Sequence, residues 1–141
     1  MNVDVNWIGV FAATLSSMVV GGIWYSNRVF GKKWAKLAGV KMGGKMTARN
    51  MAPLLVVQLL VSFITAYILA HFVFLTHSFF ANSWLMDSVT TAFWAWLGFT
   101  AVRLLTHDMF EGRRKKLTLL NGAHELVTLL VMGLVLGLLH P

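Results

Sequence analysis

Four long apolar stretches, separated by polar connections, constrain this 141-residue chain more than any other feature. They run from Trp7 to Tyr25, from Ala52 to Leu75, from about Ser88 to Thr106, and from Leu117 to Leu139. Each approaches the ~20 residues that a helix needs to cross the hydrocarbon core of a bilayer. A helix satisfies its backbone hydrogen bonds internally, and the stretches do not resemble barrel strands. We therefore predict an all-α polytopic membrane protein, with four transmembrane helices in a bundle.

The composition agrees with this class, because 57% of the residues are hydrophobic and only 12% are charged. The chain has no cysteine, which excludes disulfides, thiolate catalysis and iron–sulfur ligation. We find no repeat, no low-complexity tail and no second domain, so residues 1–141 are predicted to form a single domain. The net charge of +7 would suit nucleic acid, but the basic residues lie between apolar runs rather than across one face. We therefore expect membrane lipids, and no nucleic acid, as partners.

The basic residues predict the orientation of the chain. Residues 26–51 contain Arg28, Lys32, Lys33, Lys36, Lys41, Lys45 and Arg49 and no acidic residue, and residues 113–116 add Arg113, Arg114, Lys115 and Lys116. The connection 76–87 and both termini contain neither Lys nor Arg. The positive-inside rule then places both basic loops in the cytoplasm and both termini outside, in the inner (cytoplasmic) membrane.

Within the first basic connection, Phe30, Trp34 and Leu37 recur at the spacing of one helix face. The lysines between them occupy the other faces. We predict a short amphipathic helix on the inner leaflet, broken by Gly39, Gly43 and Gly44, before Pro53 opens the second span at an early helical position.

Small residues form a stripe along two of the predicted spans. Gly9, Ala13, Ser17 and Gly21 recur every four residues in the first span, and Gly133 and Gly137 form a GxxxG pattern in the last. Such stripes let another helix backbone approach closely. Packing inside the bundle and homodimerisation through these faces are both open.

Polar residues gather toward the predicted cytoplasmic half of the bundle. Asn121, His124, Glu125 and Thr128 share one side of the last span. An ionised side chain in hydrocarbon costs at least ~2.5 to 3.5 kcal/mol, so Glu125 should have a partner or a task. Arg103 on the preceding span is the natural partner, and Gln58 on the second span lies at comparable depth by residue count.

This polar layer has three interpretations: a structural clasp that locks the helices, a substrate, proton or ion site, and, ranked last, a catalytic site. His71 and His77 lie six residues apart, which is not the spacing of a metal pair on one helix face, so we expect no metal and no cofactor. The sequence contains no paired carboxylates at metal spacing, no nucleophile elbow and no phosphate loop. We therefore predict no catalytic residues.

Several short motifs add a resemblance to this reading. They are Gly22-Ile23-Trp24-Tyr25-Ser26, Phe30-Gly31-Lys32 with Trp34, Phe110-Glu111-Gly112-Arg113, and Asn121-Gly122-Ala123. Together they resemble the small bacterial membrane proteins of domain-of-unknown-function family 1761. The chain differs from the usual family pattern at Asn27, where a proline is common, and at His124, where an aromatic residue is expected.

The resemblance implies a four-helix membrane protein and no established activity. It also implies that the motif residues meet at the cytoplasmic mouth of the bundle, where they form either a site for a lipid headgroup or small anion or a well-packed turn. Our predicted function is binding or transport of a small molecule, lipid or ion at a polar cytoplasmic site. The candidate ligand-binding residues are Trp24, Tyr25, Gln58, Arg103, Arg113, Asn121, His124 and Glu125. The alternative is a structural or stress-related membrane subunit without transport or catalysis.

Overall fold

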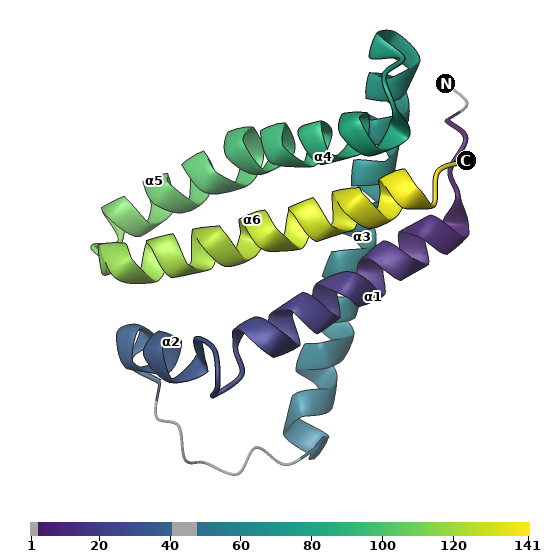
Figure 1. Cartoon of the computed structure of the whole chain (residues 1–141). Coiled ribbons are helices and arrows are strands. Elements are labelled where there is room, and N and C mark those ends of the chain that lie inside the picture. The colour runs from purple at the N-terminus through teal and green to yellow at the C-terminus, as the bar shows by residue number, and fades with distance from the viewer. Residues whose placement is uncertain (1–2, 41–47) are drawn as a thin grey trace.

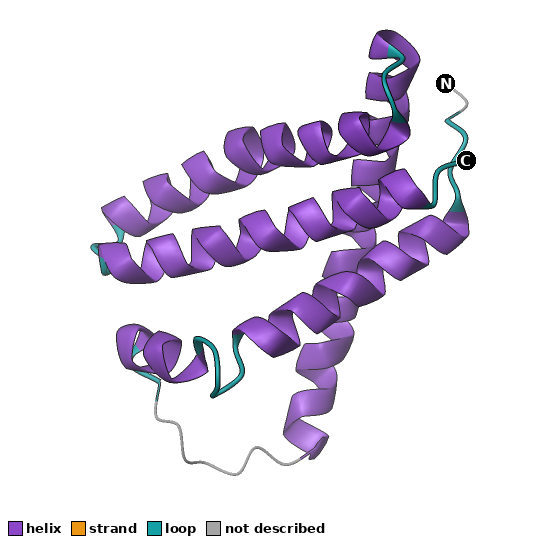
Figure 2. Ribbon diagram, viewed as in Figure 1, coloured by secondary structure: helices purple, strands orange, loops and turns teal. Residues whose placement is uncertain are grey.

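A computed structural model describes residues 3–40 and 48–141, and in these residues it contains helices and no strands (Figures 1 and 2). The elements, in order, are α1 (Trp7–Trp24), α2 (Gly31–Ala38), α3 (Ala48–Phe80), α4 (Trp84–Ala95), the π-helix η1 (Trp96–Ala101), α5 (Val102–Phe110) and α6 (Lys115–Leu138). The all-α prediction is confirmed.

Three helices are long and apolar enough to cross a membrane, over Trp7–Trp24, Met51–Phe80 and Lys115–Leu138. They correspond to the first, second and last predicted spans. The third predicted span is divided, because the π-helix η1 separates a 12-residue α4 from a 9-residue α5. The three pieces follow one another without a gap and form one extended rod beside α6 (Figure 1).

Local sequence explains several helix ends. The Asn6 side chain caps α1 by accepting hydrogen bonds from the backbone N–H groups of Ile8 and Gly9, at 3.0 and 3.3 Å. The short α2 ends at Gly39, which has φ 71° in the left-handed region, as its sequence predicts, whereas Gly43 and Gly44 lie outside the described residues. By contrast, α3 begins at Ala48, so Pro53 lies inside the helix rather than at its opening.

The core lies where α1, α3, α4 and α6 meet, and its buried side chains are Val10, Ala13, Ala66, Leu69, Val73, Ala92, Leu129, Met132 and Leu136. Small residues allow this close packing. A Cβ added to Gly133 of α6 would lie 2.8 Å from the Cβ of Ala92 and 2.9 Å from the carbonyl oxygen of Ser88, both on α4. The GxxxG stripe of α6 therefore packs against α4 within the same chain.

The small-residue stripe of α1 faces α6. A Cβ added to Gly9 would lie 2.7 Å from the carbonyl oxygen of Leu139, at the carboxyl end of α6, and one added to Gly21 would lie 3.6 Å from Nε2 of His124. Between these two glycines, Ala13 and Ser17 are buried. Both stripes thus serve helix packing within the chain.

The longest helix, α3, crosses the other three rods steeply (Figure 1). Residues 51–61, in its amino-terminal half, are exposed, including Leu54, Val57 and Leu60. The residues just before α1 and just after α6 lie together, because the Asn6 side-chain amide donates to the carbonyl oxygen of His140 at 3.3 Å.

Candidate functional site

A tight turn joins α1 to α2 and places two aromatic side chains at the end of α1. The backbone N–H of Phe30 donates to the carbonyl oxygen of Trp24 at 3.0 Å, and that of Gly31 donates to Ser26 at 2.9 Å. A Cβ on Gly31 would collide with the carbonyl oxygen of Tyr25 and lie 2.8 Å from that of Ser26. Only glycine fits here, which gives the Phe-Gly pair of the motif a structural reason.

The imidazole of His124, on α6, packs against the aromatic side chains of that turn. Its ring centroid lies 4.8 Å from that of Tyr25 and 5.9 Å from that of Trp24. On the other side of Tyr25, the Trp34 ring of α2 makes an edge contact at 5.5 Å. One histidine thus connects α6 to the α1–α2 turn.

Polar atoms surround this aromatic cluster. Nδ1 of His124 lies 3.4 Å from a carboxylate oxygen of Glu125, and Nε2 lies 3.5 Å from the hydroxyl of Thr128. Among the described residues, three side chains carry a buried polar atom without a hydrogen-bond partner, and two of them are here: Nε1 of Trp24 and Oδ1 of Asn121. A buried donor without a partner costs free energy, so it suggests a group that arrives from outside.

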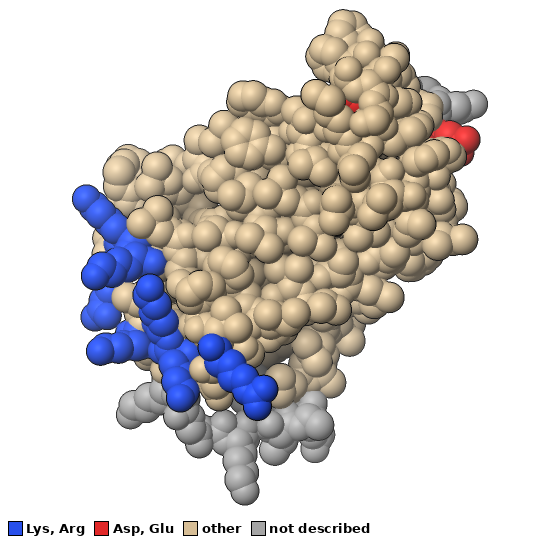
Figure 3. Space-filling model, in the orientation of Figure 1, with Lys and Arg blue, Asp and Glu red and all other residues tan. Residues whose placement is uncertain are grey.

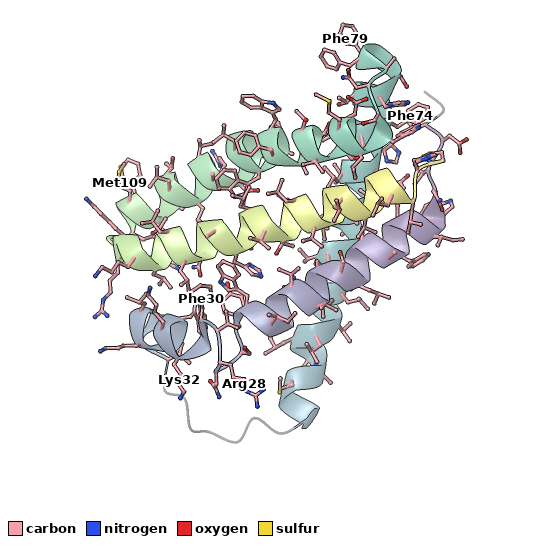
Figure 4. The ribbon with its side chains drawn as sticks, viewed as in Figure 1. Arg28, Phe30, Lys32, Phe74, Phe79 and Met109 are labelled. Carbon is pink, nitrogen blue, oxygen red and sulfur yellow. The ribbon has the colours of Figure 1, made fainter. Side chains whose placement is uncertain are left out.

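A pocket of about 390 Å³ opens beside Trp24, between α2 and the start of α6. We call it the α2–α6 pocket, and it is lined by Trp24, Phe30, Lys33, Lys116, Leu119, Leu120 and Ala123. Phe30 lies where α2 approaches α6, whereas Arg28 and Lys32 point away from the helices (Figure 4).

The α2–α6 pocket lies at the strongly basic end of the molecule. Lys and Arg side chains gather over α2 and the α5–α6 turn, and none is visible at the opposite end (Figure 3). Lys33 and Lys116 are exposed and belong to this group. The pocket therefore combines two cations, an apolar wall and the side chain of Trp24, whose buried indole N–H has no partner among the described residues, a set that suits an anionic group on an apolar body.

The predicted site residues divide into two groups in the structure. Trp24, Tyr25, His124 and Glu125 meet in one cluster, and Asn121 lies one helical turn before Glu125 on α6. Elsewhere, Arg113 pairs with Glu111 at 2.6 Å and with Asp108 at 3.6 Å, in the α5–α6 turn.

Two further predicted residues, like Arg113, lie outside the cluster. Gln58 is exposed on α3, where its amide donates to the hydroxyl of Ser62 at 3.2 Å. Arg103 is exposed on α5. Within the described ranges, Glu125 lies within ion-pair distance of His124 and not of Arg103, so the expected Arg103–Glu125 pair does not form.

Sequence reasoning did not select three residues that line the α2–α6 pocket, namely Phe30, Lys33 and Lys116. The signal for the first two was present, because they lie in the Phe-Gly-Lys-Lys-Trp segment that carries the resemblance. Lys116 had no signal of its own among four consecutive basic residues. The sequence also did not predict a hydrogen bond between η1 and α6, in which the indole N–H of Trp96 donates to the carbonyl oxygen of Gly122 at 3.0 Å.

Residues 3–40 and 48–141 hold no group of three or more His, Asp or Glu side chains that could bind a metal ion. No curated protein and no solved structure matches the chain. A family model does match, and it confirms the resemblance that the motifs suggest. Over residues 8–137, and thus over most of its length, the chain belongs to the family described as "Protein of unknown function (DUF1761)".

Proposed function

We propose that this chain is a four-span protein of the bacterial inner membrane that binds an anionic lipid at its cytoplasmic mouth, in the α2–α6 pocket. The observation that carries the proposal is the buried indole N–H of Trp24, which has no partner among the described residues and belongs to a pocket that Lys33 and Lys116 also line. A phosphate oxygen would accept from the indole and be neutralised by the lysines.

The divided rod α4–η1–α5 supplies the fourth span in this proposal. Residues 84–110 are helical throughout, and at about 1.5 Å per residue they exceed the ~30 Å of a hydrocarbon core. A π-helical turn keeps every backbone group hydrogen-bonded within the helix, so it is compatible with a membrane interior.

The orientation follows from the charges. The basic end faces the cytoplasm, α2 lies on the inner leaflet, and both termini lie outside. The Cys-free chain allows a direct test with Lys36→Cys on α2 and Ser78→Cys near the end of α3. A membrane-impermeant maleimide applied to intact spheroplasts should label the second variant only. Labelling of Lys36→Cys from outside would refute this orientation.

A lipid fits the α2–α6 pocket better than a free anion does. Phe30, Leu119, Leu120 and Ala123 give the pocket an apolar wall, and Leu119 is 72% exposed, in a helix apolar enough to face lipid. An acyl chain can follow such a wall while its phosphate stays at the lysines. A free phosphate would leave the apolar wall without a partner.

The test compares two pairs of exposed lysines, one pair that lines the pocket and one pair that does not. Lys33 and Lys116 line the pocket, whereas their neighbours Lys32 and Lys115 are equally exposed and do not. At about 1 kcal/mol for each lysine near an anionic group, removing the first pair should weaken phosphatidylglycerol binding by roughly 30-fold. Removing the second pair should change it by less than about threefold, because only long-range attraction is lost.

Binding is measured as the rise in unfolding temperature of the purified protein in neutral detergent as short-chain phosphatidylglycerol is added. Phosphatidylcholine and inorganic phosphate serve as the other ligands. If removing either lysine pair weakens phosphatidylglycerol binding equally, the lipid binds a diffuse basic surface and not a defined pocket. Equal stabilisation by inorganic phosphate would show that the ligand is a free anion.

A structural membrane subunit is the second candidate, and the contacts of His124 favour it. Its ring ties α6 to the α1–α2 turn and its Nδ1 approaches Glu125, an arrangement that can simply lock the helices. Glu125→Gln separates the two functions. A fall in unfolding temperature with unchanged lipid binding supports the clasp, whereas unchanged stability with altered lipid binding assigns Glu125 to the binding site.

A further inference from the structure

A second hollow lies between α3 and α4–η1, away from the α2–α6 pocket. Its larger part has a volume of about 550 Å³ and a smaller part about 320 Å³, and the two share Phe72, Ala95 and Phe99. We call the two parts together the α3–α4 groove. The larger part alone lies within the range of about 300 to 1,000 Å³ that is usual for small-molecule sites.

Polar groups are concentrated at one end of the α3–α4 groove, around Asp87. This carboxylate is 3% exposed, and it accepts hydrogen bonds from the Asn82 amide and from Nδ1 of His77, both at 2.9 Å. Thr91, one turn further along α4, also lines the groove, and its buried hydroxyl oxygen has no hydrogen-bond partner among the described residues. An unpaired Thr91 hydroxyl close to the hydrogen-bonded Asp87 carboxylate suggests a ligand that would form the missing hydrogen bond.

The charge at this end is acidic. The segment from residue 50 to residue 102, which includes both walls of the groove, contains neither Lys nor Arg, and its single carboxylate is Asp87. Asp4 adds a second carboxylate near this end of the molecule, where it lines a small pocket together with Trp84 at the start of α4. A positively charged ligand therefore finds a carboxylate whose one basic neighbour in the ion-pair geometry is His77, and no Lys or Arg in these walls, whereas an anionic phospholipid would be repelled.

The rest of the groove is aromatic and accessible. Trp94 on α4 and Phe99 on η1 both line it, with 61% and 72% of their surface exposed. Phe72 and Phe80 contribute from α3. Aromatic faces attract cations as well as apolar groups, so they can hold the body of a ligand whose charge is delocalised.

We propose that the α3–α4 groove is a binding site for a lipophilic monocation, with the positive charge at the Asp87 end and the apolar body between α3 and the aromatic side chains of α4 and η1. The π-helical turn contributes directly, because it carries Phe99, one of the three residues common to both parts of the groove. This site is separate from the α2–α6 pocket, and the two have opposite preferences for charge.

Two ions of nearly identical shape test the proposal. Tetraphenylphosphonium and tetraphenylborate have the same four-ring body and opposite charge. Binding to the full chain in nanodiscs of zwitterionic lipid is followed by tryptophan fluorescence, with empty nanodiscs as the blank. The native chain should bind the phosphonium at least tenfold more tightly than the borate. Equal affinity would overturn the proposal, because an apolar groove filled by any bilayer-soluble body, including lipid, gives that result.

Asp87→Asn should reduce phosphonium affinity about tenfold, and Asp4→Asn, at the same end of the molecule, should leave it within twofold of the native value. A change of less than twofold in folded Asp87→Asn would overturn the proposal. If Asp87→Asn does not fold, Phe99→Ala and Phe110→Ala decide instead. Both side chains are highly exposed, and only Phe99 lines the groove. Severalfold weaker phosphonium binding in Phe99→Ala alone supports the site, and equal affinities in the two variants refute it.

Discussion

The close contact between α4 and α6 gives a prediction whose size can be worked out atom by atom. Replacing Gly133 with alanine adds a single carbon. That carbon would lie 2.8 Å from the Cβ of Ala92 and 2.9 Å from the carbonyl oxygen of Ser88. Comfortable carbon–carbon contacts begin near ~3.5 Å, so the two helices must separate by about 0.7 Å. The oxygen belongs to the backbone and cannot rotate away.

Overpacking of this kind costs about 1 to 3 kcal/mol. Replacing a helical glycine with alanine gains about 0.5 to 1 kcal/mol where nothing obstructs the methyl group. Gly22 on α1 provides that control, because no atom lies within 4 Å of its added Cβ. Gly133→Ala should therefore lower the free energy of unfolding and Gly22→Ala should raise it slightly. The difference between them isolates the steric term, since helix propensity enters both.

The assay is reversible unfolding of each variant by sodium dodecyl sulfate in mixed micelles, followed by tryptophan fluorescence and far-ultraviolet circular dichroism. Gly98→Ala, whose added Cβ also meets nothing within 4 Å, is a second control on η1. We expect Gly133→Ala to be less stable than either control by about 1 to 3 kcal/mol. If the three variants agree within about 0.5 kcal/mol, the packing of α6 on α4 described above is wrong.

Three further predictions concern the turn and the polar clusters. Gly31→Ala should lower the unfolding temperature, whereas Gly22→Ala should not, because the Cβ added at Gly31 collides with the carbonyl oxygens of the α1–α2 turn. His124→Phe should stay close to native stability in chemical unfolding, whereas His124→Ala should lose about 2 to 3 kcal/mol, because the ring between Trp24 and Tyr25 supplies the packing. The hydrogen bond from Asn82, together with His77, lowers the pKa of Asp87. Because the folded pKa is the lower one, this carboxylate stabilises the fold above its ordinary value near ~4, and the contribution is lost as the pH falls through the lowered value. Unfolding temperatures between pH 6 and pH 3 should fall more steeply for the native chain than for Asp87→Asn, and parallel curves would contradict this assignment.

Hydrophobic length predicted the helices well where the apolar run and the helix coincide. The first and last spans agree with α1 and α6 within two residues at each end. For α3 the apolar run gave only the middle, since the helix continues through polar residues at both ends, from Ala48 to Phe80. Hydropathy reports where lipid can surround a chain and not where its hydrogen bonds stop.

The π-helical turn explains why Arg103 does not pair with Glu125 as expected. The prediction placed Arg103 by counting along an unbroken α-helix, in which each residue turns by about 100°. A π-helical turn bonds each residue one position further along, so the residues after it are rotated by about that angle. Arg103 is the second residue after η1 and is exposed. Nothing in the residue pattern of this stretch signals a π-helical turn, so the direction of Arg103 could not be predicted from residue spacing.

The cluster of Trp24, Tyr25 and His124 was more predictable, because the topology of the chain brings α1 and α6 together. The end of α1 and the beginning of α6 lie at the same basic end, so Trp24, Tyr25 and His124 had to be near one another. Which rings would touch was not predictable, because it depends on the room beside Gly21 and on the turn that Gly31 permits.

The length of α3 ties the shape of this protein to the thickness of its bilayer. At ~1.5 Å per residue its 33 residues extend about 50 Å, whereas a hydrocarbon core is about 30 Å thick. A helix so much longer than the core relieves the mismatch by tilting, and it stands more upright as the bilayer thickens. The other rods are shorter and respond less. We therefore expect the angle between α3 and α4 to depend partly on the lipids, so that a membrane of different composition would change the shape of the molecule without any ligand.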